Sequence, residues 1–156
     1  SYSMMAETLL NMREYDEAEV FYRKWEAISK ESGEKVLFNR HRFALILWMN
    51  GNKEEATVLF YKHMEVCGNS IRRGGLYGKT LAAYDLAGIH AILGDKEEAY
   101  SWLRIYEKDG FIYGLHKYIL IDQLFESLWE DEEFKAIAQR QEEKLARIRS
   151  QIDSSN

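Results

Sequence analysis

The residues in this sequence that are able to do chemistry are few and scattered. The histidines are His41, His63, His90 and His116. None has a second histidine or a carboxylate at the spacing of a helical zinc site such as H-E-x-x-H. No serine occupies a G-x-S-x-G nucleophile turn. The sequence therefore predicts no metal site, no cofactor and no catalytic residue.

Three other features suggest chemistry at first sight. Residues 73–80 are rich in glycine, but they lack the glycine spacing of a phosphate-binding loop and no β-strand precedes them, so we expect a connection between helices. The acidic run at residues 130–133 lacks the alternating ligands of a calcium loop and suits the start of a helix. Cys67 is the only cysteine, which excludes an internal disulfide, and we expect a buried apolar side chain there.

The composition is that of a folded globular protein, with 46% hydrophobic and 30% charged residues among 156. A net charge of -5 argues against a general nucleic-acid binder. No apolar run approaches the roughly 20 residues that span a bilayer, and the first residues do not have the basic and then apolar pattern of a secretory signal. The chain begins with Ser1 rather than methionine, which suggests a fragment of a larger protein. We expect a cytoplasmic location, or a periplasmic one if that larger protein is membrane-anchored.

The elements that would position any site come from an internal repeat. Three segments, residues 6–22, 44–60 and 87–103, each contain two alanines twelve residues apart and a large apolar residue four positions later. Small side chains at these spacings let two antiparallel helices pack closely, and the large residue fills the space beside the crossing. The residues are Ala6, Ala18 and Tyr22; Ala44, Ala56 and Phe60; Ala87, Ala99 and Leu103.

A polar turn joins the two helices of each predicted pair. Gly51 and Gly94 end the first helices of the second and third pairs, where the left-handed conformation favours glycine. Asn52 and Asp95 follow and are suited to cap the next helix. The first pair has no glycine at this position, and Asp16 is its predicted cap.

This pattern resembles the tetratricopeptide repeat of bacterial proteins over residues 2–106, most specifically at residues 93–99. The repeats are 38 and 43 residues apart rather than the usual 34, and the proline that often ends a repeat is missing. The resemblance implies an all-α fold: a right-handed superhelical stack of about three helix-turn-helix repeats (residues 2–32, 38–68 and 80–109), followed by C-terminal capping helices (111–152). We expect one domain over residues 1–152 and a disordered tail at 153–156.

The predicted cap consists of a short helix at residues 111–118 and a final helix at residues 132–152, whose apolar stripe is incomplete. A repeat stack needs such a polar-faced end. The final helix is longer than a cap requires. It could therefore pair with its counterpart in a second copy, which gives an alternative function as a homo-oligomerisation domain.

The resemblance also implies a binding surface, because first helices line the concave groove in which the family binds peptides. The groove residues implied for this sequence are His41, Arg42, Leu45, Trp48, Met49, Tyr84, Asp85 and Gly88. Their apolar character favours a hydrophobic or helical segment over a chaperone's C-terminal carboxylate. Alternatively, the protein's own cap fills the groove.

A local basic patch of Arg72, Arg73 and Lys79 lies in a stretch without acidic residues and could meet an acidic partner. The sequence thus predicts a non-catalytic protein–protein interaction module, as part of a larger bacterial regulator or sensor. Its partner would be a protein or peptide, without direct nucleic-acid or membrane binding, and it could also form a homodimer.

Overall fold

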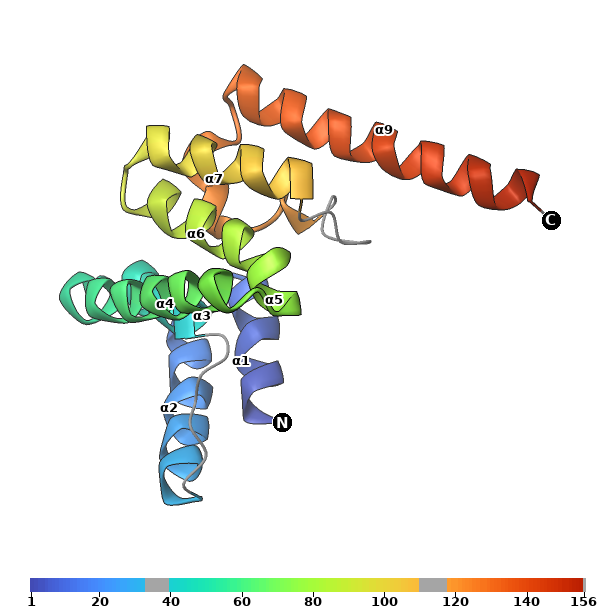
Figure 1. The fold of residues 1–156 in the computed structure, drawn as a ribbon. Coiled ribbons are helices and arrows are strands. Elements are labelled where there is room, and N and C mark those ends of the chain that lie inside the picture. Colours follow the sequence, from blue (N-terminus) through green and yellow to red (C-terminus); the bar gives the residue numbers. More distant parts are fainter. Residues whose placement is uncertain (33–39, 110–117, 156) are drawn as a thin grey trace. The chain divides into compact units, whose positions relative to one another are not determined.

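Every regular element in the described part of this computed structural model is a helix, which confirms the all-α class (Figure 1). The structure describes residues 1–32, 40–109 and 118–155. The chain divides into two compact units, residues 1–66 and 67–156, and the boundary falls within one helix. None of the described helices is both long and apolar enough to cross a bilayer. The single domain and the superhelical stack stay predictions.

The first unit is formed by two helix pairs. Its helices are α1 (Tyr2–Asn11), α2 (Tyr15–Glu31), α3 (Arg40–Met49) and the first part of α4 (Lys53–Arg73). The second unit contains the end of α4, then α5 (Leu76–Lys79), α6 (Leu81–Ile92), α7 (Lys96–Asp109), the 3-10 helix η1 (Gln123–Leu128) and α9 (Glu132–Ser154). In this unit α6 packs against both α7 and η1.

The three predicted helix pairs have the same turn. Gly51 and Gly94 adopt φ angles of +88° and +87°, and Arg13 takes the equivalent position in the first pair with φ +64°. The next residue in each turn donates its backbone N–H to a carbonyl five residues back, at 2.8 to 2.9 Å. This is the hydrogen bond of a helix end closed by a left-handed residue. The predicted glycine turns are therefore confirmed, and arginine serves where glycine is missing.

The capping predictions have different outcomes. Asp95 caps α7, because its carboxylate accepts a hydrogen bond from the backbone N–H of Glu98 at 3.4 Å. Asp16 is not the cap of α2, since the helix already begins at Tyr15 and Glu14 precedes it. Asp16 lies in the first turn instead, where a carboxylate still favours the positive end of the helix.

The repeated alanines are all completely buried. Ala6, Ala18, Ala44, Ala56, Ala87 and Ala99 each have 0% of their surface exposed, and so have Tyr22, Phe60 and Leu103. Burial at all nine positions is what the helix-packing interpretation of the repeat requires.

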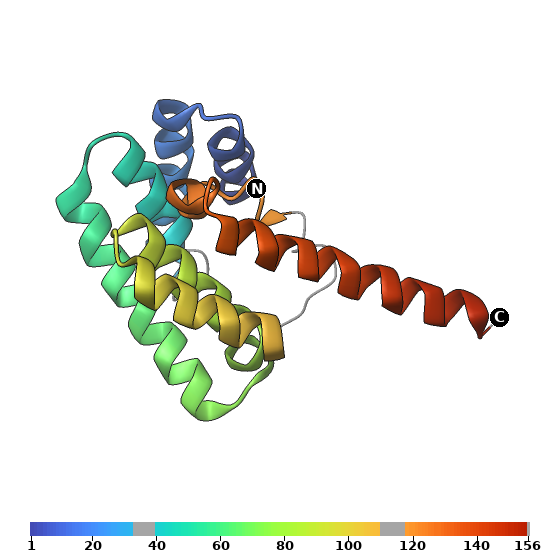
Figure 2. The ribbon, with the colours of Figure 1, turned by 90° about the horizontal axis from the view of Figure 1, so that it is seen from above.

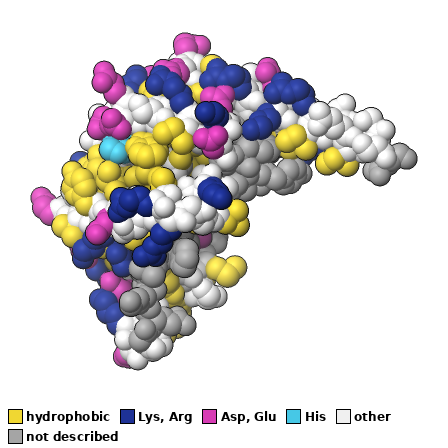
Figure 3. Space-filling view, in the orientation of Figure 1, with side chains coloured by type: hydrophobic (Ala, Val, Ile, Leu, Met, Phe, Trp, Pro, Cys, Tyr) yellow, Lys and Arg dark blue, Asp and Glu magenta, His cyan; other side chains and the backbone are white. Residues whose placement is uncertain are grey.

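The C-terminal part agrees with the sequence at the final helix. α9 begins at Glu132 as predicted and ends at Ser154, two residues beyond the predicted end. Its C-terminal half continues past α7 and projects from the other described helices of the second unit in both views (Figures 1 and 2). Ion pairs join α7 to α9, from Arg104 to Glu133 and from Arg140 to Glu107. Basic and acidic side chains are mixed over this part of the surface (Figure 3). The short helix predicted at 111–118, with His116, lies almost wholly outside the described residues.

Candidate protein-binding surfaces

The groove residues predicted on α3 are mostly buried. His41, Arg42 and Leu45 are buried, whereas Trp48 and Met49 are part-exposed at the end of the helix. The Trp48 ring packs edge-on against Phe60, with 6.1 Å between centroids. The ammonium of Lys53 lies 4.9 Å from the centre of the Trp48 ring. Trp48 is therefore held in place by an aromatic ring and a cation while part of its surface stays accessible.

The groove residues predicted on α6 are covered by the chain itself. The Tyr84 hydroxyl donates a hydrogen bond to Asp122 Oδ2 at 2.8 Å, and the Tyr84 ring lies 5.1 Å from that of Phe125. A Cβ at Gly88 would lie 3.0 Å from the Leu124 side chain. Glycine therefore allows η1 to approach α6 closely. In the third pair, η1 therefore covers α6 positions that were assigned to the groove.

Asp85, the remaining groove residue predicted on α6, takes part in a part-buried chain of hydrogen bonds within the second unit. Tyr77 donates its hydroxyl proton to Asp85 Oδ2 at 2.6 Å, and Cys67 Sγ lies 3.2 Å from the same hydroxyl. Burial raises the pKa of the Cys67 thiol to about 12, and the nearby Asp85 charge adds to this rise. A thiol that stays protonated is a poor nucleophile. The side chain is buried, as predicted from the sequence.

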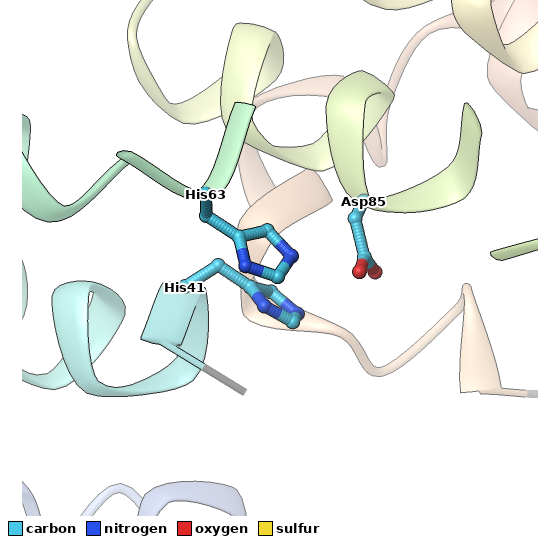
Figure 4. A group of neighbouring side chains, drawn as sticks. All are labelled: His41, His63 and Asp85. Atoms are coloured by element: carbon cyan, nitrogen blue, oxygen red, sulfur yellow. The ribbon is translucent and has the colours of Figure 1, made fainter. Parts of the chain in front are cut away.

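A histidine pair in the first unit escaped the sequence analysis. The rings of His41 on α3 and His63 on α4 lie against each other, with 4.1 Å between centroids (Figure 4). Figure 4 also draws Asp85, which belongs to the second unit. The two histidines are 22 positions apart on different helices, so a search for metal spacing within one helix could not find them.

The predicted basic patch is at the surface of the second unit. Arg72, Arg73 and Lys79 are all exposed, and Arg72 hydrogen-bonds Asn69 within α4. Lys79 lines a groove of about 600 Å³ whose other walls include Ile71, Trp102 and Ile105. An acidic partner for this patch stays a prediction.

A second apolar surface, also missed from the sequence, lies between α1 and α2. A groove of about 590 Å³ is lined by Ser1, Met4, Met5, Thr8, Leu9, Glu17 and Phe21. We call it the α1–α2 groove. Met4 is 67% exposed and Met5 48%, so both thioether side chains are accessible from solvent. The signal was present in the sequence, because Met5, Leu9 and Met12 follow one helix face and are not needed for the buried alanine crossing.

A scan against protein-family models, a search of characterised proteins and a search of solved structures returned no match to this chain.

Proposed function

We propose that this chain is a non-catalytic protein–protein interaction module in which tetratricopeptide-like helix pairs form a scaffold for a partner segment. The observation that carries the proposal is the turn shared by three helix pairs, with Arg13, Gly51 and Gly94 in the same left-handed conformation. The buried alanine pairs support it further. Repeated helix pairs of this kind offer extended binding surfaces rather than reaction centres. We further propose that the module belongs to a larger bacterial regulator or sensor.

The partner contact that we propose on the second helix pair is centred on Trp48 and Met49. Of the groove residues predicted on α3, these two are part-exposed, whereas His41, Arg42 and Leu45 are buried. Aromatic residues and methionine are enriched in protein interfaces, and a tryptophan already packed on one side loses little conformational entropy on binding. The expected ligand is an apolar or helical segment, since an apolar surface recognises the apolar face of an amphipathic helix.

Site-specific photocross-linking tests this surface. A photoreactive phenylalanine analogue replaces Trp48 in the full chain, and a matched chain carries it at Gln139, an exposed position on α9. We expect a defined protein adduct from position 48 that Met49→Lys weakens, and no such adduct from position 139. The same adducts from both positions, or none from position 48, would contradict the proposal.

Self-association through α9 is a second candidate, favoured by the projecting end of this helix. Its apolar stripe continues from the buried Leu145 to Ile148, which is part-exposed, and Ile152, which is 57% exposed. Figure 3 shows apolar side chains on the projecting part. Two such helices from two copies would bury each other's stripe, as in a short coiled coil.

Sedimentation at several concentrations decides this second candidate. We expect a weak dimer that dissociates on dilution and is lost in Ile148→Lys and Ile152→Lys variants. Gln151→Lys, an exposed control on the same helix, should leave the dimer intact. A monomer at every concentration would remove this candidate without affecting the Trp48 surface.

A further inference from the structure

The α1–α2 groove corresponds to a surface that is occupied in the second helix pair. Adding the repeat distance of 38 residues converts Met5 into Phe43 and Glu17 into Glu55. Met5 and Glu17 line the groove in the first pair. What their counterparts contact in the second pair therefore indicates what the groove is shaped to receive.

In the second pair, Phe43 and Glu55 contact α2, the helix that precedes this pair in the chain. The Phe43 ring stacks on Tyr22 with 5.3 Å between centroids and 15° between planes. The guanidinium of Arg23 lies 5.0 Å from the centre of the Phe43 ring and donates two hydrogen bonds to Glu55, at 2.9 and 3.0 Å. Phe43 in the first turn of α3 and Glu55 in the first turn of α4 thus contact two consecutive residues of α2. The first of these, Tyr22, is large and apolar, and the next is Arg23.

The second unit repeats half of this arrangement at α7 and α9. Adding 81 residues converts Tyr22 and Arg23 into Leu103 and Arg104. Leu103 is completely buried, and Arg104 donates a hydrogen bond of 2.5 Å to Glu133, in the first turn of α9. A large apolar residue followed by arginine, with the arginine paired to an acid in the first turn of a later helix, therefore occurs in both units.

From this correspondence we infer that the α1–α2 groove is a docking site for an amphipathic helix of a partner protein that carries a large apolar residue followed by arginine. The apolar residue would enter among Met4, Met5 and Phe21, and the arginine would pair with Glu17 in the first turn of α2. Methionine suits this role, because its flexible thioether chain adapts to partners of different shape. The surface is separate from Trp48 and does not depend on that contact.

A helix of a partner protein fits this groove better than α2 or α7 of a second copy does. Tyr22 and Arg23 are engaged by Phe43 and Glu55 within the same molecule, and Arg104 is engaged by Glu133. A second copy would have to break one of these contacts to offer either of these two pairs; Ile71–Arg72 and Ile148–Arg149 are further helical pairs of this kind, so self-association is one of the outcomes tested below. A helix of another protein has no such cost.

The sequence of α2 supplies a probe of the right chemistry. A fluorescently labelled peptide of residues 15–31 carries the Tyr22–Arg23 pair and is titrated with the full chain by anisotropy. A free helix of this length is only marginally stable, so we expect a dissociation constant on the order of 100 μM. Met5→Lys should weaken binding about tenfold or more, because it places a charge in the apolar part of the groove.

A charge exchange identifies the predicted ion pair. Glu17→Arg should weaken peptide binding up to about fivefold, as expected for an exposed ion pair. A peptide with Arg23→Glu should then bind the Glu17→Arg chain better than the original peptide does. Asp16→Arg is the matched control: it makes the same change in net charge one residue away, outside the groove lining, and should preserve binding.

Three outcomes of the peptide titrations would overturn the inference. These are no peptide binding at about 1 mM chain, equal binding to the Met5→Lys chain, or equal loss in Glu17→Arg and Asp16→Arg. Self-association of the chain alone that Met5→Lys abolishes would also overturn it, because the occupant would then be a second copy. Cross-linking from position 48 is unaffected by these outcomes, so failure here is distinguishable from failure of the proposed function.

Discussion

The third helix pair is covered by its own chain, whereas the first pair has an open groove. The first helix of the third pair, α6, faces η1. Gly88 lies against Leu124, and the Tyr84 hydroxyl donates a hydrogen bond to Asp122. On α1 the accessible residues are Met4 and Met5, in the α1–α2 groove. Both pairs have the same turn and the same buried alanines. The difference therefore lies in what covers the pair rather than in how the pair folds.

The covered face of α6 and the open α1–α2 groove differ in the residue types that they require. A close cover requires a small residue where backbones approach and a partner for each buried polar group, which Gly88 and Asp122 provide. An open groove requires neither, and flexible methionine side chains remain there. Substitutions should therefore be costly on the covered face and nearly neutral on the open one.

The largest effect is expected where the cover approaches most closely. Gly88→Val would force a branched side chain against Leu124, whose atoms already lie 3.0 Å from the Cβ position. We expect a loss of about 3 kcal/mol in the free energy of unfolding, measured by urea denaturation. Gly68→Val, within α4, is the control, because its Cβ would meet only an Arg72 side-chain atom, at 3.7 Å. Equal losses in both variants would mean that η1 does not cover α6 closely.

The buried hydrogen bond beneath η1 should contribute the next largest effect. Asp122→Ala removes the acceptor of the Tyr84 hydroxyl and the cap of the Leu124 N–H. It leaves a buried hydroxyl without that acceptor, so we expect a loss of about 2 kcal/mol by the same measurement. Tyr84→Phe removes the bond together with the hydroxyl and should cost about 1 kcal/mol. A larger loss from Tyr84→Phe than from Asp122→Ala would contradict this account.

Burial of the Cys67 thiol in the second unit should also affect how the free energy of unfolding depends on pH. Because the pKa of Cys67 is raised to about 12 in the folded state, the unfolded chain releases this proton first. Stability should therefore fall above about pH 9, by up to about 1.4 kcal/mol per pH unit for this group. Cys67→Ala should lose less stability than the wild type between pH 9 and 10.5, because it lacks this group. Identical pH dependence would show that the thiol is accessible to water.

The left-handed turn residues of the first and third pairs can be tested by opposite substitutions, to glycine in one and from glycine in the other. Arg13 adopts the left-handed conformation that Gly94 adopts in the third pair, and this costs a non-glycine residue roughly 1 kcal/mol. Arg13→Gly should raise the free energy of unfolding by up to that amount, and Gly94→Ala should lower it similarly, both measured by thermal denaturation. A loss from Arg13→Gly would show that contacts of the arginine side chain outweigh the strain.

The sequence was sufficient to predict the elements that depend on local rules. The alanine pairs, the left-handed glycines at 51 and 94, the Asp95 cap and the start of α9 each follow from residues close together in the chain. The left-handed conformation of Arg13 could not be read from its side chain, because arginine does not favour it. Only the repeat alignment places a turn there.

The sites depend on contacts between distant residues and were less predictable. Tyr84 and Asp122 are 38 positions apart, and nothing local indicates that a hydroxyl on α6 meets the start of η1. The same holds for the rings of His41 and His63, which only the packing of α3 and α4 brings together. The groove assignment assumed that first-helix residues stay accessible, whereas Leu45, Tyr84 and Gly88 are buried.

The smallest effect on stability is expected in the open groove, where it is also the most informative. Met5 is about half exposed, so Met5→Lys keeps its ammonium in water while its methylene chain covers much of the same apolar surface. The free energy of unfolding should change by no more than about 0.5 kcal/mol, while binding of the α2 peptide is lost. Leu10→Lys on the same helix, at a buried position, should unfold the pair and serves as the contrast. A loss above about 2 kcal/mol from Met5→Lys would show that the chain itself covers this groove, and the contrast with α6 would disappear.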